Sequence, residues 1–134
     1  MFNALIIDNN AKFCATVSEL MAKHFPAINL EQAGDGKEGF SKLLVSRPDV
    51  ILIDVEIPDE SGFELTRRIC DCYESIDIVL ISNLDLPEYR LEAYRSGAGC
   101  FIPKTGIYCL ADIMARIEGA MLRKVASRHN RKMN

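Results

Sequence analysis

Two acidic residues stand where strand-like apolar runs end. Asp8 and Asp54 each follow four apolar residues, and later in the chain Ser82 and Lys104 also follow apolar runs. An unpaired charge is costly to bury, and two neighbouring carboxylates repel one another unless a cation lies nearby. Lys104 can supply an ammonium, and an all-oxygen ligand set favours Mg²⁺ or Mn²⁺ over zinc.

These four residues are suited to phosphoryl transfer onto an aspartate. A carboxylate beside Mg²⁺ can attack a phosphoryl group, and Lys104 with the Ser82 hydroxyl can neutralise and hydrogen-bond the oxygens of the acyl phosphate. Asp54 is the better nucleophile because its strand is central, and residues 56–62 form a loop that can offer a backbone carbonyl to the metal. No glycine-rich turn follows the first apolar run, which argues against a nucleotide or flavin phosphate cradle.

The apolar runs alternate with segments of helical period, which is typical of a parallel α/β sheet. The expected strands cover residues 4–8, 28–33, 49–55, 76–82 and 100–103. The first, third and fourth contain unbroken apolar runs and so belong in the centre, covered by helices on both faces. The second alternates and the fifth carries Pro103, so both belong at the edges.

This arrangement predicts a single doubly wound five-stranded parallel sheet in the order 2-1-3-4-5, with right-handed crossovers and helices on both faces. In such a sheet, ligands bind beyond the carboxyl ends of the strands, where the strand order reverses. Asp8 and Asp54 end the two strands that flank this point.

One helix boundary is predicted by several signals at once. Asp85 is the expected N-cap, Pro87 lies in the first turn and Glu88 stands at the capping-box position. The helix is expected to run through Arg95 and to stop at Ser96-Gly97.

The chain of 134 residues is long enough for one domain and too short for two. Its formal net charge of -3 is unevenly distributed, because residues 116–134 carry six basic residues and one acid, which leaves residues 1–115 strongly acidic. We expect the domain to cover residues 1–127, with a basic tail or the start of a linker at 128–134. The alternative is that the tail charges form a solvated helix face. The composition argues against direct nucleic-acid binding.

The chain has no run of about 18 apolar residues and no signal peptide, which predicts a cytoplasmic protein without a membrane span. Its five cysteines are odd in number and lack a C-x-x-C pair. They lie in apolar-periodic segments, so we expect reduced core thiols rather than disulfides, zinc ligands or a nucleophile.

The order and spacing of several short pieces resemble a two-component response-regulator receiver domain, from Asn3 to about Ser127. Each piece is weak alone, and together they are specific. The pieces are Ala4-Leu5-Ile6-Ile7-Asp8, Asp49-Val50-Ile51-Leu52-Ile53-Asp54, Ile57-Pro58, Gly62-Phe63-Glu64-Leu65, Ile81-Ser82, Ser96-Gly97-Ala98 and Phe101-Ile102-Pro103-Lys104. The resemblance implies the flavodoxin-like fold, whose strand order is the one expected above.

The resemblance implies that Asp54 accepts a phosphoryl group from a sensor histidine kinase or phosphotransfer protein. Ser82 and Lys104 would bind the phosphoryl oxygens, and Phe101 would be the aromatic switch residue that turns inward when Ser82 moves toward the phosphate. Mg²⁺ or Mn²⁺ would be held by Asp8, Asn9, Asp54 and the backbone carbonyl of Glu56.

The resemblance also implies a signalling switch, and no enzyme activity beyond self-phosphorylation and slow autodephosphorylation. The fourth helix, fifth strand and fifth helix, about residues 85–127, would form a two-state surface that controls an output domain or a partner protein. A homodimer through this surface is a further expectation.

Two residues depart from the family pattern. Asn9 stands where the family usually has a second acid after the first strand, and this neutral ligand should weaken metal binding. Thr105 follows Lys104 where the family usually has a cis proline, so the bond between them is either trans or a cis bond that costs about 3–4 kcal/mol. Lys104-Thr105-Gly106 is similar to the form in receivers attached to LuxR-type or FixJ-type DNA-binding domains.

Three other functions stay open from the sequence. A pseudo-receiver would bind partners through a damaged metal site, which Asn9 favours. In a second alternative, the chain is the N-terminal receiver excised from a DNA-binding transcription regulator. A haloacid-dehalogenase-type phosphatase would use Asp54-Val55-Glu56 as its acid pair, although that class carries an Asp-x-Asp pair on its first strand.

Overall fold

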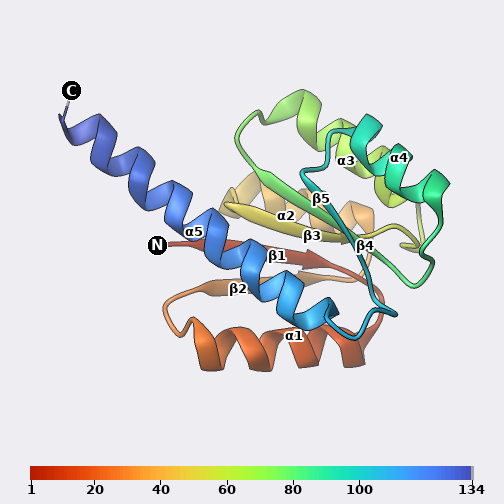
Figure 1. Ribbon diagram of the computed structural model, residues 1–134. Helices are drawn as coiled ribbons and strands as arrows, with labels where there is room; N and C mark the ends of the chain where they lie inside the picture. Colours follow the sequence, from red (N-terminus) through yellow and green to blue (C-terminus); the bar gives the residue numbers. More distant parts are fainter. Residues whose placement is uncertain (134) are drawn as a thin grey trace.

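The computed structural model describes residues 1–133, in which strands and helices alternate along the chain (Figure 1). In chain order these are β1 (Asn3–Ile7), α1 (Ala11–His24), β2 (Asn29–Ala33), α2 (Gly36–Ser46), β3 (Val50–Asp54), α3 (Gly62–Cys72), β4 (Asp77–Ser82), α4 (Pro87–Ser96), β5 (Cys100–Pro103) and α5 (Cys109–Met133). The strands pair in parallel in the order β2-β1-β3-β4-β5. The predicted fold class, strand order and edge strands are confirmed.

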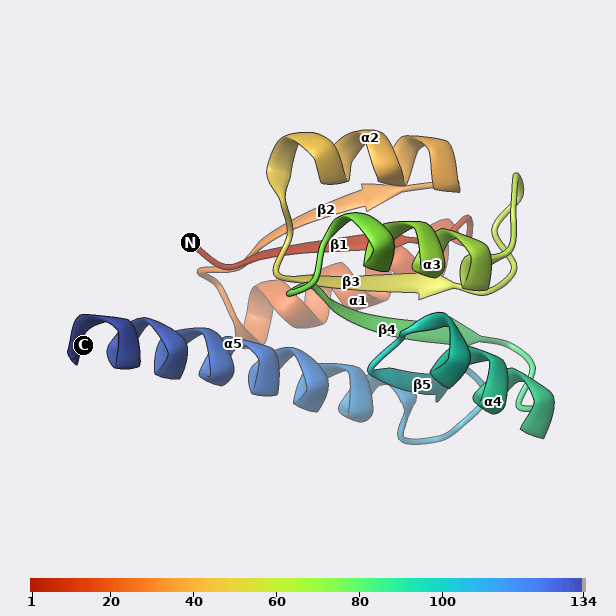
Figure 2. The ribbon, with the colours of Figure 1, turned by 90° about the horizontal axis from the view of Figure 1, so that it is seen from above.

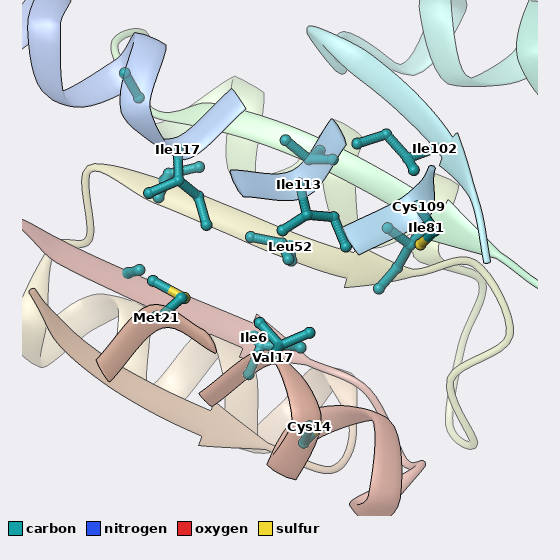
Figure 3. Packing of buried hydrophobic residues seen from close by; sticks show 14 of the residues in the cluster. Ile6, Cys14, Val17, Met21, Leu52, Ile81, Ile102, Cys109, Ile113 and Ile117 are labelled. Atoms are coloured by element: carbon teal, nitrogen blue, oxygen red, sulfur yellow. The ribbon is translucent and has the colours of Figure 1, made fainter. Parts of the chain in front are cut away.

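Helices cover both faces of the sheet, as its apolar central strands require (Figure 2). On one face, Met21 of α1 and Ile117 of α5 pack in one cluster with Leu52 of β3 (Figure 3). On the other face, Leu43 of α2 and Ile69 of α3 pack with the alternate residues of the same strands. Each of these side chains contributes roughly 1.5–3 kcal/mol by leaving water, so the layers hold the strand ends in fixed relative positions.

The segment after β3 approaches the strand closely at Gly62. A Cβ at this position would lie 2.4 Å from the Asp54 carbonyl oxygen, so a larger residue does not fit without a shift of the backbone. The Gly62 N–H donates to the Val55 carbonyl oxygen at 2.8 Å, and the Ser61 side chain caps α3. The loop from Glu56 to Ser61 therefore returns to the end of β3.

The start of α4 differs from the prediction. Leu86, not Asp85, is the N-cap, and its side chain makes no cap hydrogen bond. Pro87 disfavours a helical conformation in the residue before it, so the helix begins at the proline, and the Asp85 carboxylate instead pairs with Arg90 at 2.9 Å. The predicted end is confirmed, because Gly97, with a φ of 103°, closes the helix.

Helix α5 extends beyond the predicted domain boundary. The expected tail or linker start at 128–134 is helical up to Met133, and Asn134 lies outside the described residues. Figures 1 and 2 show the last turns of α5 extending past the sheet. The middle of the helix is held by ion pairs. Arg116 and Arg123 pair with Asp77 at the start of β4, and Lys124 pairs with Asp49 just before β3. No helix within residues 1–133 is long and apolar enough to cross a membrane.

The five cysteines are free thiols, but they are not all core residues. Cys14 and Cys109 are buried, whereas Cys72 is exposed and corrects the prediction of a buried thiol there. Cys72 is the last residue of α3, where the helix ends at the surface. Burial raises the pKa of Cys14 to about 11, so this thiol stays protonated at neutral pH.

Candidate functional site

The parallel pairing of the strands brings the candidate site residues to one edge of the sheet. Asp8 follows β1, Asp54 ends β3, Ser82 ends β4 and Lys104 follows β5. These four strands are neighbours in the sheet, and β1 and β3 flank the point where the strand order reverses. This is the carboxyl edge at which open α/β sheets bind ligands.

Lys104 lies between the two carboxylates. Its Nζ is 2.7 Å from Asp8 Oδ2 and 3.0 Å from Asp54 Oδ2, and none of the three side chains is more than 8% exposed. Burial by itself lowers the pKa of Lys104, but the interactions with Asp8 and Asp54 outweigh burial and raise it. The ammonium also lies 4.5 Å from the centre of the Phe13 ring. Lys104 is therefore charged at neutral pH, and its ammonium is held by contacts with Asp8, Asp54 and Phe13.

The Asp8 carboxyl group is buried at the carboxyl edge of the sheet. Burial raises its pKa, while Lys104 and the N–H of Asn10, which donates to Oδ1 at 2.8 Å, partly offset the effect. Oδ2 is fully buried, and within residues 1–133 its polar contact is the Lys104 ammonium. A buried carboxylate oxygen that already lies against a cation has a free lone pair for a metal ion.

The metal donors at this edge are all oxygens. The Asp8 and Asp54 carboxylates lie together, the Glu56 carbonyl follows β3, and the exposed Asn9 lines an open cavity of about 290 Å³ with Asp8. Within residues 1–133, no three His, Cys, Asp or Glu side chains gather as a ligand cage. The residues fit Mg²⁺, which usually takes one or two carboxylates and keeps several water ligands.

Ser82 has a partner that its position in the sequence does not reveal. Its buried hydroxyl donates to the Glu56 carboxylate, at 2.7 Å from Oε1 and 3.1 Å from Oε2. The N–H of Glu56 in turn donates to Asp54 Oδ1 at 3.1 Å. Burial raises the pKa of Glu56. The available sequence signal was an acid two residues after Asp54, to which the receiver resemblance gives a role only through its backbone carbonyl.

The loop after Asp54 is fastened to the start of α2. Asp59 accepts hydrogen bonds from the backbone N–H groups of Gly36, at 2.8 Å, and Lys37, at 3.0 Å. These hydrogen bonds hold the pKa of Asp59 below its ordinary value. The carboxylate lies at the positive end of the helix dipole and positions the loop that carries the Glu56 carbonyl.

We expect Asp59→Ala to weaken the fold in a pH-dependent way. Because the pKa is lowered in the folded chain, the ionised carboxylate stabilises the fold at neutral pH, by about 0.3–1 kcal/mol for an exposed charge at a helix N-terminus. This contribution is lost as the pH falls from the ordinary value of 3.8 through the lowered pKa. Urea unfolding at a series of pH values should show the deficit of the variant shrinking toward acid pH. A deficit independent of pH, or the same deficit in Asp71→Ala on α3, would contradict this assignment.

Phe101 and the Lys104–Thr105 peptide bond are two further positions at which the sequence was compared with the receiver pattern. Phe101 is half-buried in the cluster that contains Ala93, and the Arg90 guanidinium lies 5.4 Å from the centre of its ring. The bond between Lys104 and Thr105 is trans, as is every peptide bond within the described residues. The cis alternative is therefore wrong.

Fold and site together define an α/β domain of the flavodoxin-like class with a lysine-bridged acidic edge. The family model of the response regulator receiver domain matches residues 4–118, and the chain belongs to this family. Receiver domains are generally signalling modules rather than catalysts, and they generally bind Mg²⁺ at the phosphorylation site.

Relatives and similar structures agree with this assignment. The probable transcriptional regulatory protein TcrX of Mycobacterium tuberculosis is 26% identical over 120 residues, which cover 90% of this chain and 49% of that protein. The transcriptional regulatory protein RprY of Bacteroides fragilis is 31% identical over 115 residues, or 86% of this chain and 46% of that protein. The chain thus spans about half the length of these relatives.

Among solved structures, the N-terminal domain of an uncharacterized protein from Wolinella succinogenes has a TM-score of 0.83 at 27% identity. The match covers 95% of this chain and 99% of that one. A LuxR-family DNA-binding response regulator from Staphylococcus aureus has a TM-score of 0.80 at 15% identity, with coverage of 90% and 98%. At that identity the second likeness shows a shared fold.

Proposed function

We propose that the chain accepts a phosphoryl group on Asp54 from the phosphohistidine of a sensor histidine kinase or phosphotransfer protein. A carboxylate oxygen of Asp54 forms the new P–O bond as the P–N bond of the donor breaks, and the imidazole keeps the electron pair of that bond and takes up a proton. Asp8, Asn9, Asp54 and the Glu56 carbonyl would hold Mg²⁺, which neutralises charge on the transferred group when bound.

The buried Lys104 bridge between Asp8 and Asp54 supports this proposal most strongly. An ammonium held 3.0 Å from Asp54 can pair with an oxygen of a phosphoryl group on that residue. The Ser82 hydroxyl at the same edge is a second donor for such an oxygen. Hydrolysis of the acyl phosphate is expected to be slow, so the chain acts as a switch.

The switch is proposed to act through the surface of α4, β5 and α5. The N–H of Lys104 donates to the Ser82 carbonyl oxygen at 2.7 Å, which ties the candidate site to β5. Phe101 lies on β5, and Leu91 and Tyr94 on α4 are exposed. We infer that an output domain, a partner protein or a second copy of the chain docks on this surface.

Asn9 favours one other function, a pseudo-receiver that works without phosphate. Compared with the acid that the family usually has at this position, Asn9 removes one negative charge from the metal site. Because Asp8, Asp54, Ser82 and Lys104 are all present, we expect weaker metal binding rather than none. Membership of a longer DNA-binding regulator is compatible with the proposal, since transcriptional regulators among the relatives are about twice as long. The phosphatase alternative is not supported, because Asp54 ends the third strand rather than the first.

Incubation with acetyl phosphate and Mg²⁺ tests the proposed function. The intact mass of the chain should rise by one phosphoryl group, and neither Asp54→Ala nor the wild-type chain in EDTA should show the gain. No gain at saturating Mg²⁺ would favour the pseudo-receiver. Sustained hydrolysis of phosphate esters would instead favour the phosphatase.

A further inference from the structure

The hydroxyl of Ser82 donates its hydrogen bond to the Glu56 carboxylate in this structure. Ser82 is fully buried and faces both carboxylate oxygens of Glu56, at 2.7 Å and 3.1 Å. The hydroxyl oxygen also accepts a hydrogen bond from the backbone N–H of Leu84 at 3.0 Å. A serine hydroxyl carries one proton, and here that proton is directed at the Glu56 carboxylate.

Glu56 lies at the edge of the site, where the nearby ammonium of Lys104 is already paired with two other carboxylates. Lys104 pairs with Asp8 and Asp54, and within residues 1–133 no lysine, arginine or histidine forms an ion pair with Glu56. The hydrogen bond from the Glu56 N–H to Asp54 Oδ1 keeps the backbone of Glu56 next to that carboxylate. The Ser82 hydroxyl thus holds the Glu56 side chain against the site, next to the Asp54 carboxyl group.

A phosphoryl group on Asp54 would compete with Glu56 in two ways. One of its oxygens requires the single proton of Ser82, which Glu56 now receives. The acyl phosphate also carries close to two negative charges where the Asp54 carboxylate carried one, beside a Glu56 carboxylate that forms no ion pair within residues 1–133. Glu56 is an exposed residue, so solvent and salt screen this repulsion, and competition for the Ser82 proton is the larger effect. Both effects favour departure of the Glu56 side chain.

We propose that Glu56 is a positioning residue that holds Ser82 in the unphosphorylated chain and is displaced when Asp54 is phosphorylated. This inference rests on the proposed phosphoacceptor function. Loss of the Ser82–Glu56 hydrogen bond opposes phosphorylation and frees Ser82 to turn toward the phosphoryl group. The chain therefore carries an internal competitor that makes its phosphorylation slower and less complete.

Glu56→Ala and Glu56→Gln separate the hydrogen bond from the charge. Both variants keep the backbone carbonyl, but alanine removes the acceptor for Ser82, whereas glutamine keeps an acceptor oxygen without the charge. NMR of the Leu84 amide, which donates to Ser82 Oγ, reports on this contact in the unphosphorylated chain. We expect a large change of its chemical shift in Glu56→Ala and a small change in Glu56→Gln.

The rate of phosphorylation by acetyl phosphate and Mg²⁺ is the second readout. We expect an increase of about three- to tenfold in Glu56→Ala, the range that corresponds to the loss of one hydrogen bond, and a smaller increase in Glu56→Gln. Glu74→Ala, which removes an exposed acid in the loop before β4, should match the wild-type chain.

The two readouts distinguish failure of this inference from failure of the proposed function. A Leu84 amide unchanged in Glu56→Ala, or equal phosphorylation rates in Glu56→Ala and the wild-type chain, overturns the competitor role alone. Phosphorylation of Glu56→Ala under conditions in which the wild-type chain gains no phosphoryl group would support it most strongly. If no variant gains a phosphoryl group, the phosphoacceptor function fails and the competitor role fails with it.

Discussion

Lys104→Met should destabilise the chain by about 3–5 kcal/mol, the usual cost of removing one partner from a buried ion pair. Methionine preserves much of the side-chain volume but leaves Asp8 and Asp54 facing one another without the ammonium that now lies within 3.0 Å of both. Burial already raises the pKa of Asp8. In the variant we expect that pKa to rise further, because the remaining neighbour is a like charge.

Urea unfolding in EDTA measures this loss of stability. Added Mg²⁺ should recover part of it, because a divalent cation can replace the missing positive charge between the carboxylates. Asp54→Asn in the Lys104→Met background should also restore stability, since it removes the repulsion. Lys37→Met alters an exposed lysine on α2 and is the matched control. A loss below about 1 kcal/mol in Lys104→Met, the scale of a surface pair, would contradict the buried bridge.

Asn9→Asp should tighten Mg²⁺ binding by about tenfold or more. The substitution adds a formal negative charge to the candidate ligand set next to Asp8, and the number of charged ligands strongly tunes the affinity of such sites. In the absence of metal, the same charge adds to the repulsion between Asp8 and Asp54, so the metal-free variant should be less stable than the wild-type chain. Calorimetric titration with Mg²⁺ measures the affinity without any phosphodonor.

Asn10→Asp is the matched control for this effect. It adds the same charge one residue later, at the N-cap of α1, where the Asn10 side chain accepts a hydrogen bond from the Phe13 N–H at 3.0 Å. Aspartate serves equally well as an N-cap, so the helix should be preserved. If both variants tighten Mg²⁺ binding equally, the gain is a long-range effect of charge and Asn9 is not a ligand.

Most of the fold is predictable because a strand covered by helices on both faces must be apolar along its length. This rule identified β1, β3 and β4 as central, and Pro103 identified β5 as an edge strand. The cap of α4 was wrongly predicted because Asp85 is a favourable cap by residue type, whereas Pro87 sets the conformation of Leu86. Cys72 was wrongly placed in the core because helical periodicity does not show where α3 reaches the surface.

The members of the candidate site could also be predicted from the sequence. Asp8, Asp54, Ser82 and Lys104 end or follow apolar runs, and the carboxyl ends of parallel strands meet at one edge of the sheet. That argument needs only the strand order, which the burial pattern supplies. It explains why the four side chains lie together in the structure.

Only the tertiary structure decided which partners the loop acids take. Glu56 meets Ser82 across 26 positions of sequence, and Asp59 meets Gly36 across 23. Both acids belong to a polar loop without hydrophobic period, so no pattern distinguishes their side chains from others in the same loop. The path of such a loop is set by packing at its two ends, here by the close approach of Gly62 to Asp54. The competitor for Ser82 therefore becomes visible only in the folded chain.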